Sequence, residues 1–129
     1  SLDGIIWQSS PIFTNLENGT YMVYVRDILG CGLLVTQELK TITYPNYFTP
    51  NNDGYNDIWK IDLPTSYEAS ISIYDRYGKL IKKLNSLNNE VWDGTYNGNL
   101  LPSTDYWFRV EYTENNAKKE FKSHFSLKR

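Results

Sequence analysis

Apolar and polar residues alternate with a period of two along several stretches of the chain. In residues 105–113, Tyr106, Phe108 and Val110 alternate with side chains that are charged or carry a polar tip. This period places one set of side chains in a core and the other in water, as in a half-buried β-strand. The same pattern is found in three further stretches: residues 20–27, 68–75 and 120–127. Shorter strand candidates are residues 10–14, 33–39, 58–63 and 79–84.

Residues typical of tight turns separate the predicted strands at short intervals. Tyr77-Gly78 follows one strand, and Asn97-Gly98 is a pair that readily adopts positive φ in a two-residue turn. Short strands joined by frequent turns favour an all-β fold over a helical one. We therefore predict an immunoglobulin-like, Greek-key antiparallel β-sandwich, preceded by a partial β-repeat.

The distribution of predicted strands indicates a boundary between two units near residues 41–45. The roughly forty residues before this point hold three or four predicted strands, too few for an independent sandwich. The stretch after it holds six or seven, enough for a compact domain. We predict two units, residues 1–43 and residues 44–129. Because the chain does not begin with Met, we also expect it to be part of a longer protein.

Composition narrows the possible functions. The chain has 129 residues, of which 16% are aromatic, and a formal charge of −2 at pH 7, which argues against general nucleic-acid binding. No apolar run approaches the roughly 20 residues of a membrane helix, so we expect no membrane insertion. The single cysteine, Cys31, is interpreted as a small buried apolar residue. Its alternative is a disulfide to a cysteine outside this chain.

The densest polar cluster lies at residues 51–57. Its members, grouped around Gly54, are Asn51, Asn52, Asp53, Asn56 and Asp57. The favoured interpretation is a rigid turn whose side chains bond their own backbone. The alternative is a calcium site at Asn51, Asp53 and Asp57, although Asp62 stands where an EF-hand loop has its closing Glu. We predict no cofactor, with calcium as the lesser possibility.

No arrangement of residues typical of an enzyme is found in the sequence. It has no nucleophile elbow, phosphate-binding glycine loop or zinc-protease motif, and its only histidine, His124, lies on the polar face of a predicted strand. We therefore predict no enzymatic activity. Aromatic residues are too numerous for all to be in the core, and an exposed subset would suit a sugar-binding platform. The candidates are Tyr47, Tyr55, Trp59, Trp92 and Trp107.

Basic residues gather near the end of the chain. They are Lys118, Lys119, Lys122, Lys128 and Arg129, against one acidic residue, Glu120. Lysines on a terminal strand discourage edge-to-edge aggregation. Alternatively, they offer a positive surface to a partner.

Four segments of the second unit follow one another in a distinctive order: YPNYFTPNNDGYNDIWKI, ISIYDRYGKLI, WDGTYNGNLLPSTDYWFRV and KEFKSHFSLKR. In these segments residues 44–129 resemble the gliding-motility-associated C-terminal domain, the type B sorting domain of the type IX secretion system of Bacteroidota. Ser103-Thr104 stands where many members have a glycine. Residues 1–43 resemble the last strands of an immunoglobulin-like repeat of large cell-surface adhesins.

The resemblance implies a C-terminal secretion signal for an adhesin-like surface protein. Such a protein passes through the periplasm and crosses the outer membrane to the cell surface or the medium. The implied partner is an outer-membrane protein of the PorP/SprF type, together with the type IX translocon. We expect the five basic residues to contact the partner and the 51–57 loop to present a fixed turn. Six residues are expected to hold the sandwich corners: Tyr74, Asp75, Gly78, Trp92, Asp93 and Gly94.

Two alternatives from other classes remain open. The first is a carbohydrate-binding or adhesive β-sandwich module, with or without stabilisation by calcium. The second is an accessory domain of an enzyme whose catalytic part lies elsewhere.

Overall fold

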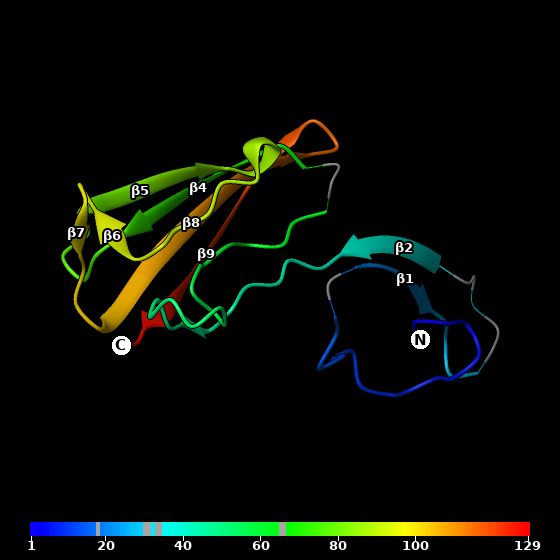
Figure 1. Ribbon diagram of the computed structural model, residues 1–129. Helices are drawn as coiled ribbons and strands as arrows, with labels where there is room; N and C mark the ends of the chain where they lie inside the picture. Colours follow the sequence, from blue (N-terminus) through cyan, green and yellow to red (C-terminus); the bar gives the residue numbers. More distant parts are fainter. Residues whose placement is uncertain (18, 30–31, 33–34, 65–66) are drawn as a thin grey trace. The chain divides into compact units, whose positions relative to one another are not determined.

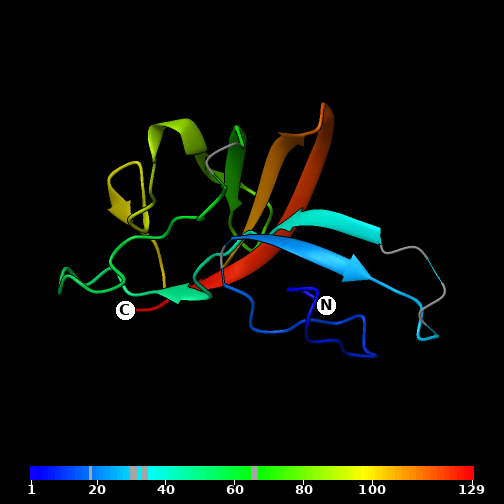
Figure 2. The same cartoon turned by 90° about the vertical axis from the view of Figure 1, so that its right-hand side faces the viewer.

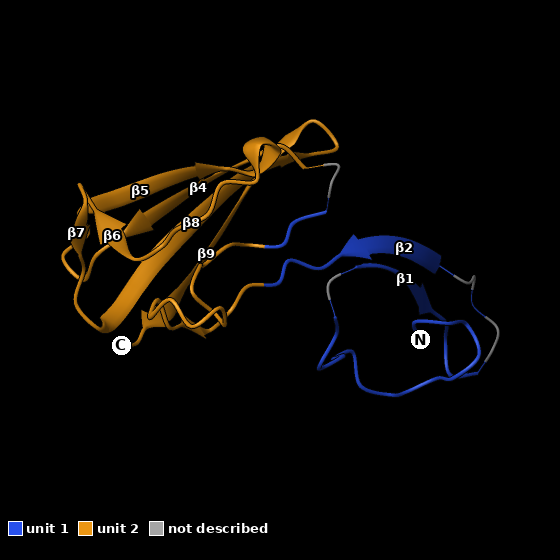
Figure 3. Cartoon of the chain, in the orientation of Figure 1, with its two compact units in different colours: residues 1–43, 62–64 blue, residues 44–61, 65–129 orange. Residues whose placement is uncertain are grey.

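The computed structural model describes residues 1–17, 19–29, 32, 35–64 and 67–129, and Figures 1 and 2 show its elements from two sides. Cys31 lies outside the described residues, so its environment stays a prediction. The chain forms two compact units (Figure 3). Unit 1 comprises residues 1–43 and 62–64, and unit 2 comprises residues 44–61 and 65–129.

Unit 1 is built on one antiparallel pair of strands, β1 (Thr20–Val25) and β2 (Val35–Lys40). The backbone of Ser1 exchanges two hydrogen bonds with that of Tyr24, which holds the beginning of the chain beside β1. The strand predicted at residues 10–14 does not form. Pro11 has no N–H to donate, and the Ile12 N–H bonds to the Ser10 hydroxyl instead of to another strand.

Unit 2 contains the main sheet of the protein, whose five strands lie in the order β3-β9-β8-β4-β5. Its two longest strands, β8 and β9, pair without interruption from Thr104↔Leu127 to Glu114↔Ala117. The elements of this unit, in chain order, are β3 (Tyr47–Phe48), β4 (Ala69–Tyr74), β5 (Leu80–Asn85), the 3₁₀ turn η1 (Ser86–Asn88), β6 (Thr95–Tyr96), β7 (Asn99–Leu100), β8 (Thr104–Glu114) and β9 (Ala117–Leu127).

The first and last strands of unit 2 are neighbours and run parallel. Tyr47 pairs with Ser126 and Phe48 with Leu127, while the other pairs in this sheet are antiparallel. The backbone N–H groups of Ser126 and Lys128 donate to the carbonyls of Asn46 and Phe48. The sequence did not predict this pairing, because a two-residue strand is too short to show an alternating pattern of apolar and polar residues.

One face of the sheet carries the core. The inward residues of β8 are buried, whereas Trp107, between them, is 43% exposed. The alternation therefore assigned the two faces of β8 correctly. The buried apolar residues of β4, β5, β8 and β9 are Ala69, Ile71, Ile73, Ile81, Leu84, Tyr106, Phe108, Val110, Phe125 and Leu127.

Two tryptophans from outside the sheet cover this core. Trp59 stacks on Phe125 with ring centroids 4.0 Å apart, and Trp92 packs edge-on against Tyr106 at 5.1 Å. Their backbones form an isolated antiparallel bridge, and Asp62 forms a second one with Thr43, so two single bridges replace the strand predicted at residues 58–63. Each indole N–H donates to a backbone carbonyl, that of Pro45 and that of Thr95 respectively.

The covering layer also includes the β6–β7 hairpin, whose turn has Asn97 and Gly98 at φ 50° and 78°, as the sequence predicts. The predicted all-β fold is confirmed, and the arrangement is consistent with a β-sandwich whose second layer is largely irregular.

Candidate functional site

The 51–57 loop is organised around one carboxylate. Asp57 Oδ1 accepts hydrogen bonds from the backbone N–H groups of Asn51 and Asn52 at 3.0 and 2.6 Å, and Oδ2 accepts one from Gly54 at 2.8 Å. Burial alone would raise the pKa of Asp57, but these three N–H groups favour the charged form and hold that pKa below its usual value. Asp57 thus stabilises the loop by accepting hydrogen bonds from three of its backbone N–H groups.

The other acidic side chain of the loop is engaged locally as well. Asp53 Oδ1 accepts from the Tyr55 N–H, and its Oδ2 accepts from the Asn51 side-chain amide, both at 2.8 Å. Asn52 and Asn56 adopt positive φ of 64° and 51°, a conformation that asparagine tolerates better than most residues. The arrangement is a self-bonded turn.

These bonds bear on the candidate calcium ligands Asn51, Asp53 and Asp57. Their oxygens point to donors inside the loop, so an entering cation would compete with existing hydrogen bonds. Within the part of the chain that the structure describes, no group of three or more His, Cys, Asp or Glu side chains is placed to hold a metal ion.

Asp75 holds the turn after β4. Its Oδ1 accepts from the N–H groups of Tyr77 and Lys79, both at 2.9 Å, and Gly78 adopts φ 80°. The Tyr74 side chain precedes this turn on the face of the sheet opposite the core.

Asp93 and Gly94 hold the corner after Trp92. Asp93 Oδ1 accepts from the backbone N–H and the hydroxyl of Thr95, at 3.0 and 2.7 Å. The hydroxyl bond is the largest influence that lowers the pKa of Asp93 below its usual value. Gly94 has φ 80°, and a Cβ there would lie 2.8 Å from Leu127 Cδ1, so any other residue would strain the backbone and displace Leu127.

Arg129 is tied to backbone groups. Its N–H donates to Ser103 Oγ at 3.0 Å, and its guanidinium donates to the carbonyls of Leu101 and Gly94. The residue thus links the end of β9 to the segment that carries the β6–β7 hairpin. The sequence offered no indication of this role, since Arg129 belongs to a run of basic residues.

The five basic residues predicted as a cluster differ in the contacts that their side chains make. Lys119 pairs with Glu114, and Lys122 with Glu120 at 2.8 Å. The Lys128 ammonium lies over the Tyr47 ring, 4.7 Å from its centroid. Within the described ranges, the Lys118 side chain makes no hydrogen bond or ion pair. The structure therefore does not bring the five residues together as a single patch.

The outer face of the sheet, opposite the core, carries side chains in cross-strand rows. Trp107 lies opposite Tyr74 on β4 and His124 on β9, which gives an aromatic row. The Trp107 and His124 rings are 6.4 Å apart. The next row has Arg109 opposite Lys122. The alternation placed Trp107 and His124 on the polar face, but the register that joins them to Tyr74 was not available from the sequence.

Next to the basic row lies an acidic row, Glu111 and Glu120. Arg109 Nη2 lies 2.6 Å from Glu111 Oε1. Glu120 Oε2 lies 2.5 Å from Arg109 Nε, although this contact lacks the alignment of a hydrogen bond. Ion pairs between the basic and acidic rows fix the positions of both sets of side chains.

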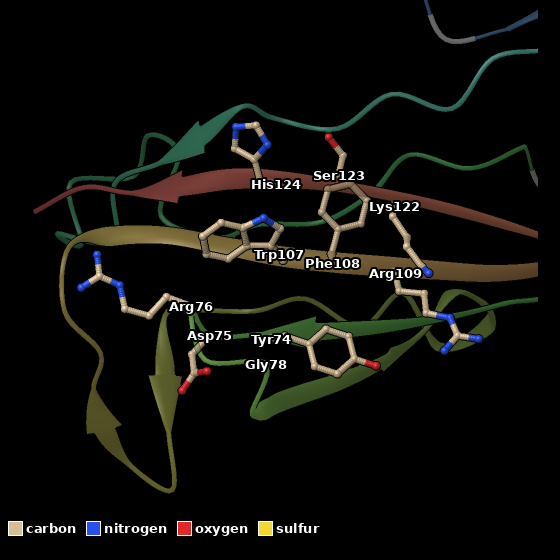
Figure 4. Close-up of a pocket in the computed structure, with 10 residues that line it drawn as sticks. All are labelled: Tyr74, Asp75, Arg76, Gly78, Trp107, Phe108, Arg109, Lys122, Ser123 and His124. Carbon is tan, nitrogen blue, oxygen red and sulfur yellow. The ribbon is translucent and has the colours of Figure 1, made fainter.

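An open groove of about 810 Å³ runs along this face (Figure 4). Trp107 lies at its centre, with Arg76 toward one end and Arg109 and Lys122 toward the other. The groove is lined by Tyr74, Asp75, Arg76, Gly78, Trp107, Phe108, Arg109, Lys122, Ser123 and His124. Sequence analysis missed Arg76, which belongs to a turn rather than to an alternating strand.

These features define a small all-β domain whose loops are fixed by their own polar groups and whose sheet leaves one face open. The family model for the CHU_C type IX secretion signal domain matches residues 42–127, more than half of the chain. The chain belongs to this family, which confirms the predicted resemblance to a type IX sorting domain. No curated protein and no solved structure matches the chain.

Membership of this family has direct consequences. A type IX secretion signal directs export by that system to the cell surface or outside, and interacts with its machinery. This is a non-enzymatic role. In the described part of the chain, no helix has the length and apolar character needed to cross a membrane.

Proposed function

We propose that unit 2 directs an adhesin-like surface protein from the periplasm across the outer membrane by binding a partner of the PorP/SprF type. Unit 1 is then the C-terminal part of an immunoglobulin-like adhesin repeat in the exported protein. The observation that carries the proposal is the family match at residues 42–127, which covers almost all of unit 2.

Recognition of a prearranged surface is the mechanism that suits this domain. The 51–57 loop is fixed by Asp57 before any partner arrives, so little conformational entropy is lost on binding. Of the five basic residues, Lys118 and Lys128 are the two whose side chains form neither an ion pair nor a hydrogen bond within the described ranges. We assign the first electrostatic contact to these two lysines. Lys119, Lys122 and Arg129 act beside them, already positioned by their own bonds.

The test is the export of a periplasmic fluorescent reporter. Three fusions are compared: the reporter joined to residues 1–129, to residues 44–129 and to residues 1–43. Each is expressed in a host with a type IX system, with and without the cognate outer-membrane partner. We expect surface or extracellular fluorescence from the first two fusions only when the partner is present, and none from the third.

The outcomes separate the parts of the proposal. Export of the 44–129 fusion without the partner would remove the PorP/SprF role but leave the secretion signal. Retention of both longer fusions in both hosts would contradict the proposed signal itself. Export of the 1–129 fusion without export of the 44–129 fusion would show that the signal also needs residues of unit 1.

A further inference from the structure

We propose that the outer-face groove is a binding site for an acidic oligosaccharide, with a sugar ring on Trp107 and a carboxylate at Arg76. The site goes beyond the secretion role. Its test contains no secretion step, so either proposal can fail alone.

Trp107 is the centre of the site because it is unusually open for a tryptophan. It is 43% exposed, whereas Trp59 and Trp92 are 0% and 1% exposed in the core of the same unit. Its cross-strand neighbours are Tyr74 and His124, two further rings with polar tips. An indole face of this kind can stack on the C–H face of a pyranose ring.

The size of the aromatic row suits a short oligosaccharide. Neighbouring strands lie about 4.8 Å apart, so the row from Tyr74 to His124 spans roughly 10 Å, or about two pyranose rings. Two residues along β8, Arg109 lies about 7 Å from Trp107. Basic groups therefore lie within the length of two pyranose rings of the aromatic row.

The charges of the lining favour an anionic ligand. Three basic residues line the groove, Arg76, Arg109 and Lys122, against one acidic residue, Asp75. Arg109 and Lys122 share the carboxylates of the acidic row. Arg76 forms no ion pair or hydrogen bond with any described residue, so its guanidinium is available for a bidentate contact with a carboxylate.

The polar groups beside Trp107 suit a saccharide better than a peptide. Asp75 uses Oδ1 for the backbone of its turn. Its Oδ2 accepts no hydrogen bond within the described residues and is free for a sugar hydroxyl. The lining contains no aliphatic side chain, whereas peptide-binding grooves rely on apolar pockets or on a free strand edge. A uronic acid offers hydroxyl groups, a carboxylate and a C–H face of its ring. The Asp75 carboxylate, the Arg76 guanidinium and the Trp107 ring are suited to bind these three features in turn.

The test is a titration of the ¹⁵N-labelled 129-residue chain with hexagalacturonate, followed by NMR. We expect the indole N–H resonance of Trp107 to shift and saturate, while those of Trp59 and Trp92 stay in place because their N–H groups are bonded inside unit 2. Trp107→Ala should weaken binding at least about tenfold. Arg76→Ala should weaken it about two- to fivefold and reduce its dependence on salt.

Two variants serve as matched controls, and their spectra also report folding. Tyr77→Ala removes an 85% exposed ring from the same turn without touching the groove lining, and Lys118→Ala removes a cation from another part of β9. Both should bind as the unchanged chain does.

Three results would overturn the proposal. If a neutral hexasaccharide such as maltohexaose bound equally well, the proposed contact between a sugar carboxylate and Arg76 would be excluded. Polyglutamate displacing the sugar with equal or higher affinity would assign the groove to an acidic peptide. Absence of a Trp107 shift up to millimolar hexagalacturonate would leave no such site.

Discussion

Asp57 makes the 51–57 loop sensitive to acid. Backbone N–H groups hold its pKa in the folded protein below the usual 3.8, despite the opposing effect of burial. A carboxylate with a lowered folded pKa stabilises the protein above its unfolded pKa, and this contribution is lost as the pH falls through the folded pKa.

We therefore expect Asp57→Asn to lower Tm at neutral pH. The gap to the unchanged chain should narrow as the pH falls below 3.8, because protonation removes the same charge. Circular dichroism melts between neutral and acidic pH measure this. Parallel Tm profiles for the two proteins would show that the charge of Asp57 does not stabilise the loop.

Gly94 and Gly98 have nearly the same positive φ but differ in surroundings. Their φ angles are 80° and 78°, yet a Cβ at Gly94 would lie 2.8 Å from Leu127, while nothing lies within 4 Å at Gly98. We expect Gly94→Ala to destabilise unit 2 by about 2–4 kcal/mol, from φ strain plus overpacking. Gly98→Ala should cost only about 1–2 kcal/mol. Chemical denaturation provides both values, and equal losses would mean that Leu127 moves aside freely.

Among the elements, β9 depends on the packing of its last residue. Leu127 is 1% exposed, pairs with Phe48 and lies against the Gly94 corner. We expect Leu127→Ala to cost about 2–5 kcal/mol. Leu100→Ala, on β7 and 71% exposed, should stay within about 0.5 kcal/mol. Urea titrations compare the two, and a small loss at Leu127 would show that the end of β9 contributes little to the fold.

The strands of the main sheet could be predicted wherever alternation extends over several residues. In β8 the pattern gave the buried face, including Phe108, and the exposed position of Trp107. Turn chemistry likewise gave the Asn97-Gly98 turn. Local patterns carry this information because side-chain period and turn conformation are properties of neighbouring residues.

Pairings between distant residues could not be predicted in the same way. The β3–β9 pair, the Trp59–Trp92 bridge and the bonds of Arg129 to Gly94 and Leu101 each join parts of the chain far apart in sequence. No periodicity encodes such partners. For the same reason the sequence showed five similar basic residues, whereas the structure gives them different contacts.

For the molecule as a whole, two exposed lysines near the opposite ends of β9 are tested by charge reversal. We expect Lys118→Glu combined with Lys128→Glu to reduce export of the reporter joined to residues 1–129 several-fold, with Tm little changed because both side chains are exposed. Surface fluorescence and Tm are measured together.

The matched control reverses two lysines on β5, the edge strand at the other side of the sheet from β3 and β9, as Lys82→Glu with Lys83→Glu. It makes the same change in net charge and should export normally. Equal export by both double variants would exclude a specific electrostatic contact at β9, and an equal loss would point to net charge alone.

The parallel pairing of β3 with β9 also sets the order of events in folding. Tyr44 bonds Ser123 across 79 residues of chain, and Tyr47 lies beside Ser126. Contacts of such long range form late, since the loop between them must close first. In the described sheet β9 is the strand that joins β3 to β8, so β3 enters the sheet only after β9 has been synthesised.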